Sequence, residues 1–485
     1  MTTAKEKMLE IVERDEAGNI VASYVESRSE KRESSSRVDV ILPKETKSYS
    51  QQLLDVFLPA GYPSSVTEDY IHYQIYDSLQ AFSSSIAGLI SSRAVLEGVG
   101  VGDASASPTA ALLLSVLQES MGRIVTILFA HRLGTALEPE CKMYRFAADI
   151  FNDTSMILDC LSPAFPKGIR VLVLSFSSVL RSLCGVCAGS SKASLSAHFA
   201  KKGNLGELNA KDSSQETVIS LLGMLAGSVV VSWISSPLAT WTTLIFLLGV
   251  HLTTNYFAVT AVSMRSLNRQ RANIVLSHML AYGTILRPAD VSRLERVFER
   301  DGILRSFEGN SRAKAIGHCK IGMTLESVLR RMGRSHYRTG SLNLRIKLSE
   351  LLRIYENEAY VLWFEEGEYG SRSEAWIVLK EDATPTDQLK AWCQALLLAQ
   401  QAHTRRAKAA KGKRELERSE DAKDADGSAS ESEGRLLAEL RLTTQEVRKL
   451  FDAYVERLTD VGWDLEIAAL ETRAGTRMKI GSHQH

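Results

Sequence analysis

Two aspartates and an asparagine in a half-apolar stretch are the first residues of this sequence that could do chemistry. Asp149 and Asp153 are four residues apart, and Asn152 lies beside them. Residues four apart share one face of an α-helix, so we expect both carboxylates to point to the same side. This face is either a solvated surface or, in a bundle of apolar helices, a polar site.

More charged and polar residues recur in the apolar segments around this pair. Ionised groups inside a membrane are expensive, and they persist where they pair or line a wet cavity. We therefore predict one compensated cluster inside a helical bundle, in which Arg123 and Arg181 balance the acids. The predicted members are Asp77, Glu119, Arg123, Asp149, Asn152, Asp153, Arg181 and Asn255.

A glycine-rich stretch, GVGVGD, covers residues 98–103 and raises the possibility of a phosphate-binding loop. Its spacing differs from G-x-G-x-x-G, and the residues before it suit a helix rather than a strand. Ser107 and Pro108 then suit the first positions of a new helix. We predict a turn between two helices here.

Other patterns of catalysis are missing from the sequence. Its histidines have no metal-ligand spacing, and neither G-x-S-x-G nor H-E-x-x-H occurs. These motifs mark serine hydrolases and zinc hydrolases. We predict no catalytic residue, no metal site and no cofactor, and therefore no enzyme; which residues would bind a ligand stays open.

The strongest pattern is a charge-free run from Thr217 to Met264, interrupted at Ser235-Ser236-Pro237. A membrane-spanning helix needs about 20 mostly apolar residues. Residues 218–234 and 238–259 both have the required length and composition. They predict a helical hairpin across a membrane, and the alternative is a buried hairpin of a large soluble protein.

Four weaker apolar segments precede this hairpin, at residues 73–94, 108–130, 143–161 and 171–190. With six crossings, the basic loop residues gather on the side of both termini, which the positive-inside rule assigns to the cytosol. The order and composition of the segments also repeat, which predicts two inverted three-helix halves. The alternative is that these four are amphipathic helices that never cross.

Composition sets the remaining boundaries. The net charge of +1 argues against nucleic acid, and six cysteines in 485 residues suit a reducing, intracellular compartment. We predict a mainly α protein, a polytopic membrane bundle followed by a small soluble α+β region. The expected parts are a disordered polar tail (1–50), the membrane bundle (51–271), an α+β region (272–403), a charged disordered linker (404–434), and a helix and strand that complete the α+β region (435–485).

Within the α+β region, AYVLWFEEG and SEAWIVLKED are expected to form a pair of strands around the turn GEYGSR. Thr384 and Pro385 suit the start of the helix that follows. GWDLEIAAL, at residues 462–470, is expected to form the last strand.

An ordered set of motifs resembles the root UVB sensitive family. The motifs are FLPAGYPSSVTEDYIHYQIYDSLQAF (57–82), GVGVGD (98–103), FAADIFND (146–153), KKGNLGELNAKDSSQET (201–217) and RSLNRQR (265–271). The resemblance covers residues 53–271 and, more loosely, the C-terminal part. It implies a membrane-associated protein linked to vitamin B6 homeostasis, with members that act together. It transfers no catalytic residue.

We therefore expect an integral, intracellular membrane protein that acts like a transporter in vitamin B6 or other small-molecule homeostasis. Its expected partners are the lipid bilayer and either another family member or a second copy of itself, but no nucleic acid. One alternative is a membrane-bound scaffold that recruits a partner through the C-terminal region. The other is a soluble helical enzyme.

Overall fold

A computed structural model describes eleven segments of the chain, and they form two compact units. The segments are residues 9–14, 20–28, 36–42, 56–99, 107–201, 203–307, 313–335, 342–344, 346–367, 372–416 and 429–481. The first unit comprises Met1–Gln118, Asp149–Leu180 and Lys192–Val262. The second comprises Glu119–Ala148, Arg181–Ser191 and Ser263–His485. Each unit is described by itself.

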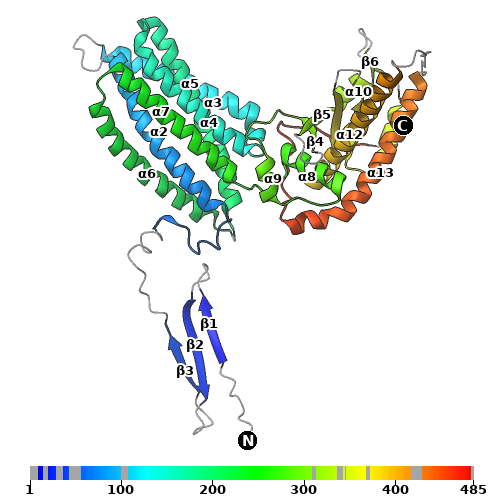
Figure 1. Ribbon diagram of the computed structural model, residues 1–485, viewed down its shortest axis with the longest axis horizontal. Helices are drawn as coiled ribbons and strands as arrows, with labels where there is room; N and C mark the ends of the chain where they lie inside the picture. Colours follow the sequence, from blue (N-terminus) through cyan, green and yellow to red (C-terminus); the bar gives the residue numbers. More distant parts are fainter. Residues whose placement is uncertain are drawn as a thin grey trace. The chain divides into compact units, whose positions relative to one another are not determined.

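Long helices build the first unit. Helix α2 (Tyr70–Val99) packs along both α6 (Leu205–Trp233) and α7 (Pro237–Ala261), and the three lie side by side in Figure 1. Parts of α4 (Cys141–Leu161) and α5 (Lys167–Phe199) complete this unit. A small core joins α2, α4 and α7 through Ala87, Ile90, Met156, Leu244 and Leu248.

Two glycines allow α6 to approach α2 closely. A Cβ atom at Gly223 would lie 2.6 Å from Ser85 Cβ, and one at Gly227 would lie 2.8 Å from Leu89 Cδ1. Both distances are shorter than a van der Waals contact, so only glycine fits. This G-x-x-x-G spacing is common where membrane helices pack.

Among the described residues, four helices are long and apolar enough to cross a membrane. They are α3 (Pro108–Leu137), α5, α6 and α7. The helix starts agree with the sequence, because α3 begins at Pro108 and α7 at Pro237, where Ser236 Oγ accepts from the Ala239 amide at 3.2 Å. Helices α2 and α4 are present but are not among the four. Of the predicted glycine turn at residues 98–103, Gly98 and Val99 form the end of α2, and the other four residues lie outside the described part of the chain.

A mixed five-stranded sheet organises the second unit. Strand β9 (Ser373–Lys380) runs antiparallel to β8 (Tyr360–Glu365) and parallel to β5 (Lys314–Ile321) and to β10 (Arg477–Met478). Strand β4 (Ile303–Ser306) pairs antiparallel with β5 at the other edge. The predicted pair of strands is therefore confirmed as β8 and β9.

Helices cover this sheet and enclose a large core. Helix α12 (Pro385–Leu416) packs on β4, β5, β8 and β9, and it contacts both α8 (Arg269–Tyr282) and α13 (Ala429–Val461), as Figure 1 shows. Trp376, Trp392 and Trp463 are almost completely buried between these elements. Three short helices complete the unit: α9 (Pro288–Leu294), α10 (Leu325–Met332) and α11 (Leu348–Ile354). Strands β6 (Gly333–Ser335) and β7 (Leu342–Leu344) form a small antiparallel pair.

The structure differs from the sequence analysis at the N-terminus. Strands β1 (Leu9–Arg14), β2 (Ile20–Arg28) and β3 (Ser36–Ile41) form an antiparallel sheet where a disordered tail is predicted. The reason is β propensity, because LEIVER, IVASYVESR and SRVDVI are rich in valine and isoleucine. The average polarity of the tail hides these short segments.

Two further predictions fail in the C-terminal part. Helix α12 continues to Leu416 through the first part of the predicted linker, because Ala, Lys, Arg and Glu are strong helix formers even without a core to pack on. Residues 417–428 lie outside the described part. The last strand is β10 rather than residues 462–470, where Asp464 forms only an isolated bridge with Ser266.

Candidate functional site

Helix α2 carries a row of buried polar side chains along one face. Gln74, Asp77, Gln80 and Ser91 are all buried, and their spacing keeps them on one side of the helix. From Gln74 to Ser91 the row extends about 25 Å, since a helix rises about 1.5 Å per residue. This length is comparable to the hydrocarbon thickness of a bilayer, about 30 Å.

The centre of the row faces two buried carboxylates on α4 and a histidine on α7. His251 Nδ1 lies 2.7 Å from Asp153 Oδ1, and His251 Nε2 lies 3.3 Å from Asp149 Oδ2. Asn255 Nδ2 donates to Asp149 Oδ2 at 2.5 Å, and Gln80 Nε2 donates to the same oxygen. All five side chains are buried. We call His251, Asp149 and Asp153 the histidine–aspartate cluster.

A second carboxylate contact lies two turns further along α4. Asp159 accepts from Ser177 Oγ on α5 at 2.6 Å and from Ser91 Oγ on α2 at 3.1 Å. Asp159 and both serines are buried. Helices α2, α4 and α5 therefore also meet through hydrogen bonds, where a water-soluble bundle would usually have apolar contacts.

The other end of the row holds a third polar contact. Gln74 Nε2 donates to Asp212 Oδ1 on α6 at 2.7 Å. Lys192 Nζ on α5 reaches Asp212 Oδ2 at 2.6 Å and Glu216 Oε1 at 2.7 Å. The α2 row thus meets a carboxylate at three levels, Asp212, Asp149 and Asp159.

The chemistry available to the histidine–aspartate cluster is proton exchange. Imidazole is the side chain that most readily gains and loses a proton near neutral pH. Here it contacts two carboxylates at once, and Asp153 Oδ2 has no hydrogen-bond partner among the described residues.

The structure brings together only part of the predicted cluster. Asp149, Asp153 and Asn255 lie in one contact network, and Asn152 Nδ2 donates to Ser84 Oγ on α2 at 3.2 Å. Asp77 is buried on α2, in the same row.

The predicted role of the arginines is wrong for Arg123. Its guanidinium pairs with Glu119 at 3.4 Å, one turn away on α3, and the two side chains are 80% and 69% exposed. Arg181 is also exposed. The pair of Arg123 with Glu119 lies within α3 and does not involve an acid of α4. Asp149 and Asp153 are contacted by two amides and an imidazole, those of Gln80, Asn255 and His251.

Sequence reasoning missed His251 and Gln80. The available signal was that His251 precedes Asn255 by four residues in the charge-free segment, which places both on one face of α7. A histidine without metal-ligand spacing was dismissed, although a carboxylate contact needs no such spacing.

Buried charges of the second unit are arranged differently. Glu295 accepts from Lys142 Nζ at 2.6 Å and from Arg271 Nη1 at 2.7 Å, and all three side chains are buried. Burial raises the pKa of the Glu295 carboxyl, but the two cations outweigh burial and hold this pKa below its usual range. The ion pairs of Glu295 with Lys142 and Arg271 therefore stabilise the fold of the second unit.

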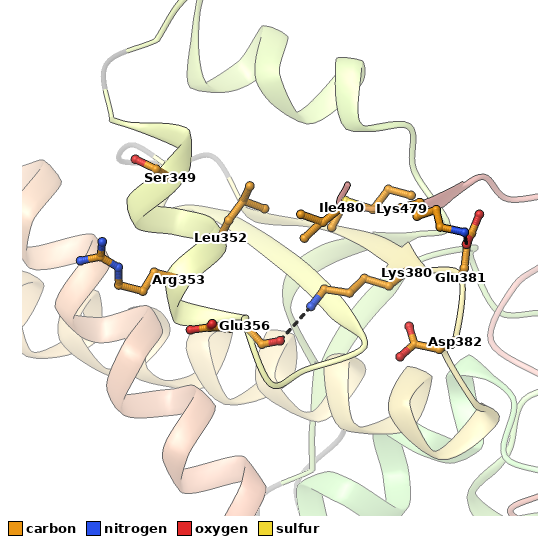
Figure 2. A pocket seen from close by; sticks show the side chains of 10 residues that line it. Ser349, Leu352, Arg353, Glu356, Lys380, Glu381, Asp382, Lys479 and Ile480 are labelled. Carbon is orange, nitrogen blue, oxygen red and sulfur yellow. Dashed lines mark hydrogen bonds and ion pairs between the residues drawn. The ribbon is translucent and has the colours of Figure 1, made fainter. Parts of the chain in front are cut away.

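A hollow of about 550 Å³ lies beside the end of β9 in the second unit. Figure 2 shows Lys380 pointing to the Glu356 backbone, and Lys380 Nζ donates to the Tyr355 carbonyl at 2.8 Å and to the Glu356 carbonyl at 3.3 Å. Lys479 pairs with Glu381 at 3.1 Å. Both lysines of this hollow therefore already have acceptors within the protein.

Long apolar helices around a buried polar row, together with an α+β unit, define a mainly helical protein with candidate membrane spans. Residues 43–283 match the family model of the vitamin B6 photo-protection and homoeostasis domain, and residues 319–473 match that of the C-terminal part of root UVB sensitive proteins. The chain belongs to the root UVB sensitive family.

Relatives in two organisms support this assignment. The protein root UVB sensitive 3 of Arabidopsis thaliana is 32% identical over 356 residues, which cover 72% of this chain and 75% of that protein. RUS family member 1 of Dictyostelium discoideum is 42% identical over 249 residues, which cover 50% of this chain and 47% of that protein, about half of its length. No solved structure matches.

Proposed function

We propose that this chain is an integral membrane protein that moves a small solute together with a proton through its first unit. The observation that carries the proposal is the buried histidine–aspartate cluster, His251, Asp149 and Asp153, in a bundle that exposes large apolar side chains. Ionisable groups inside membrane bundles usually mark proton relays or substrate paths.

The exposed apolar surface supports the membrane part of this proposal. Leu225, Phe246 and Leu172, on α6, α7 and α5, are between 58% and 70% exposed. Soluble monomers rarely expose contiguous apolar patches of this kind. A bilayer would cover them and leave the polar row on α2 inside.

The helix order supports a topology of six crossings. Helices α2 to α7 follow one another as six long helices, four of which have the composition of a membrane span. Six crossings place both termini on one side, and the loop charges assign that side to the cytosol. We further propose two three-helix halves of inverted topology, an arrangement common in transporters.

Membership of the family suggests the solute. The matching family model is described by vitamin B6 photo-protection and homoeostasis. We propose that the solute is a vitamin B6 compound, that the protein is no enzyme, and that it functions as an oligomer with itself or with another family member.

The test uses the full chain reconstituted into liposomes that contain a pH-sensitive dye. With a pH gradient imposed, pyridoxine should accelerate proton flux through the wild-type protein. His251→Gln should abolish the acceleration, because the glutamine amide cannot bind and release a proton near neutral pH. His72→Gln is the matched control, since His72 lies on α2 with an exposed side chain.

Two results would overturn the proposal at different points. Absence of any pyridoxine-dependent proton flux in well-inserted wild-type protein would contradict the proposal that the solute is a vitamin B6 compound. Recovery of the wild-type chain in the soluble fraction after carbonate extraction of membranes would contradict the proposal that it is an integral membrane protein.

A further inference from the structure

A small cavity in the second unit has the composition of an anion site. Its volume is about 120 Å³, and residues from four separate parts of the chain line it, among them Glu140. Arg269 comes from the start of α8, Arg300 from the segment before β4, and Thr472 and Arg473 from the segment after α13. Arg269 belongs to the RSLNRQR motif, whose role the proposed transport through the first unit does not explain.

Contacts fix the guanidinium of Arg269 in place. Its Nε donates to the Leu470 carbonyl at 2.6 Å, its Nη1 pairs with Asp301, and the group lies over the Trp392 ring at 5.8 Å from the ring centroid. The side chain is buried. These contacts leave Nη2 as a donor in a fixed position, which suits an oxyanion.

Thr472 provides the observation that points to a ligand. This residue is 5% exposed and lines the cavity, and its Oγ1 atom has no hydrogen-bond partner among the described residues. Buried hydroxyls almost always have a partner. Its neighbour Glu471 holds the segment in place, because it binds Arg477 at 2.6 Å and Gln388 at 3.2 Å.

The charges around the cavity leave a positive excess. Of the acids that line it, Asp301 pairs with Arg269, and Glu299 accepts two hydrogen bonds from Arg305, each of 2.8 Å. Arg300 and Arg473 are exposed and form no ion pair within the described residues.

The remaining acid of the cavity does not offset this excess. Burial raises the pKa of the Glu140 carboxyl, although Arg271 acts in the opposite direction. Even an ionised Glu140 would balance only one of the two arginines Arg300 and Arg473. The carboxyl also accepts from Asn268 Nδ2 at 3.1 Å.

We propose that this cavity binds the phosphate group of a small phosphate monoester, or inorganic phosphate itself. Arg269 and Thr472 would hold the oxygens at the bottom, and Arg300 and Arg473 would neutralise the charge at the opening. The volume is about four times the ~30 Å³ that one water takes in the liquid, which suits one phosphate group rather than a whole nucleotide. Both family domains contribute, since Arg269 lies in the first match and Thr472 in the second.

The test measures thermal unfolding of the full chain in detergent against inorganic phosphate, with chloride used to keep the ionic strength constant. The wild-type protein should be stabilised along a saturating curve, as expected for a ligand that binds the native state. Arg473→Gln and Thr472→Val should each raise the half-saturating concentration by roughly tenfold, the loss expected for one charge-assisted hydrogen bond.

Control variants separate a lost contact from a damaged fold. Thr472→Ser keeps the hydroxyl and should bind like the wild type. Arg330→Gln removes an exposed arginine of α10 that pairs with Glu326, and it should leave the phosphate response unchanged. A wild-type protein without saturable stabilisation would overturn the proposal, and so would equal responses of wild type, Arg473→Gln and Thr472→Val.

A second pair of ligands distinguishes the source of the phosphate. Glycerol 3-phosphate should replace inorganic phosphate in the same curve if the ligand is a free monoester. Stabilisation by phosphatidic acid in mixed micelles, without any by glycerol 3-phosphate, would show instead that the cavity takes a lipid headgroup, and would overturn the assignment to a soluble ligand.

Discussion

The first unit places polar side chains inside and large apolar side chains outside, whereas the α+β region from Ser263 onward has the reverse arrangement. In the first unit, Asp149, Asp153 and His251 are buried while Leu225 is 58% exposed. In the α+β region, Trp376 and Trp392 are buried in a continuous apolar core.

This difference is expected if the two regions fold in different solvents, as the proposed membrane position of the first unit implies. Burial of apolar surface drives folding only where the surroundings are water. Within a bilayer the lipid is as apolar as leucine, so helices associate through close packing and hydrogen bonds instead. The glycine contacts of α6 and the hydrogen bonds of the α2 row are contacts of this second kind, and the aromatic core around α12 is of the first kind.

The largest effect is expected at a buried ion pair of the second unit. Glu295→Gln leaves Lys142 and Arg271 without the carboxylate that both of them contact. Loss of one partner of a buried pair destabilises a protein by about 3–5 kcal/mol. Unfolding of the full chain in detergent measures the change. Glu326→Gln, which removes an exposed pair on α10, should change stability by less than about 1 kcal/mol.

The same carboxyl predicts a dependence on pH. Because the pKa of Glu295 is lowered in the folded protein, its contribution is complete above the usual pKa of 4.5 and is lost as the pH falls through the lower folded value. The wild-type protein should therefore lose stability in acid below about pH 4.5 more steeply than Glu295→Gln. Parallel curves would show that this pair does not control acid unfolding.

The second effect tests the two solvents directly, with one substitution in each unit. Leu225→Arg on α6 should disrupt membrane insertion, because a central arginine costs about 2.5–3.5 kcal/mol on insertion scales. Leu442→Arg is the matched control, since Leu442 on α13 is 65% exposed and should face water. Carbonate-resistant membrane fractions measure insertion. Equal loss, or no loss in either variant, would contradict a membrane position for α6.

The third effect concerns close packing in the first unit. Gly223→Ala places a Cβ atom 2.6 Å from Ser85 Cβ and 3.0 Å from the Phe82 carbonyl, so α2 and α6 must separate. Overpacking of this kind costs about 1–3 kcal/mol. Gly249→Ala on α7 meets no atom within 4 Å and should leave stability unchanged or raise it. Thermal unfolding in detergent compares the two, and a stable Gly223→Ala variant would argue against this helix contact.

The sequence predicted the elements better than it predicted their contacts. The charge-free segment and the proline positions located α6 and α7, because composition and start signals are local properties of the chain. The alternation in β8 and β9 was equally local. The N-terminal strands were missed because β-branched residues in segments of six to nine residues are a weaker signal than the average polarity around them.

The candidate site could be predicted only in part for a related reason. A helical repeat places Asp149 and Asp153 on one face of α4, but no local rule states which helix lies opposite. Arg123 looked like a suitable partner by charge, yet its ion pair is with Glu119, one turn away on its own helix. His251 lies 98 residues from Asp153 in sequence, and only the packing of α7 on α4 brings them together.

The smallest effect distinguishes His251, the partner of Asp153 in the structure, from Arg123, the partner expected from charge alone. The contact of His251 Nδ1 with Asp153 Oδ1, at 2.7 Å, should give a coupling free energy in a double-mutant cycle of His251→Gln and Asp153→Asn. Hydrogen bonds inside membrane proteins couple by about 0.6 kcal/mol on average and up to about 1.7 kcal/mol, because the groups find other partners when the contact is lost. The control cycle pairs Arg123→Met with Asp153→Asn and should be additive, since Arg123 is exposed and pairs with Glu119. Both cycles are measured by unfolding in detergent. Coupling in the Arg123 cycle together with additivity in the His251 cycle would support the predicted pairing of Arg123 with the α4 acids. It would also contradict the proposed role of His251 in proton movement.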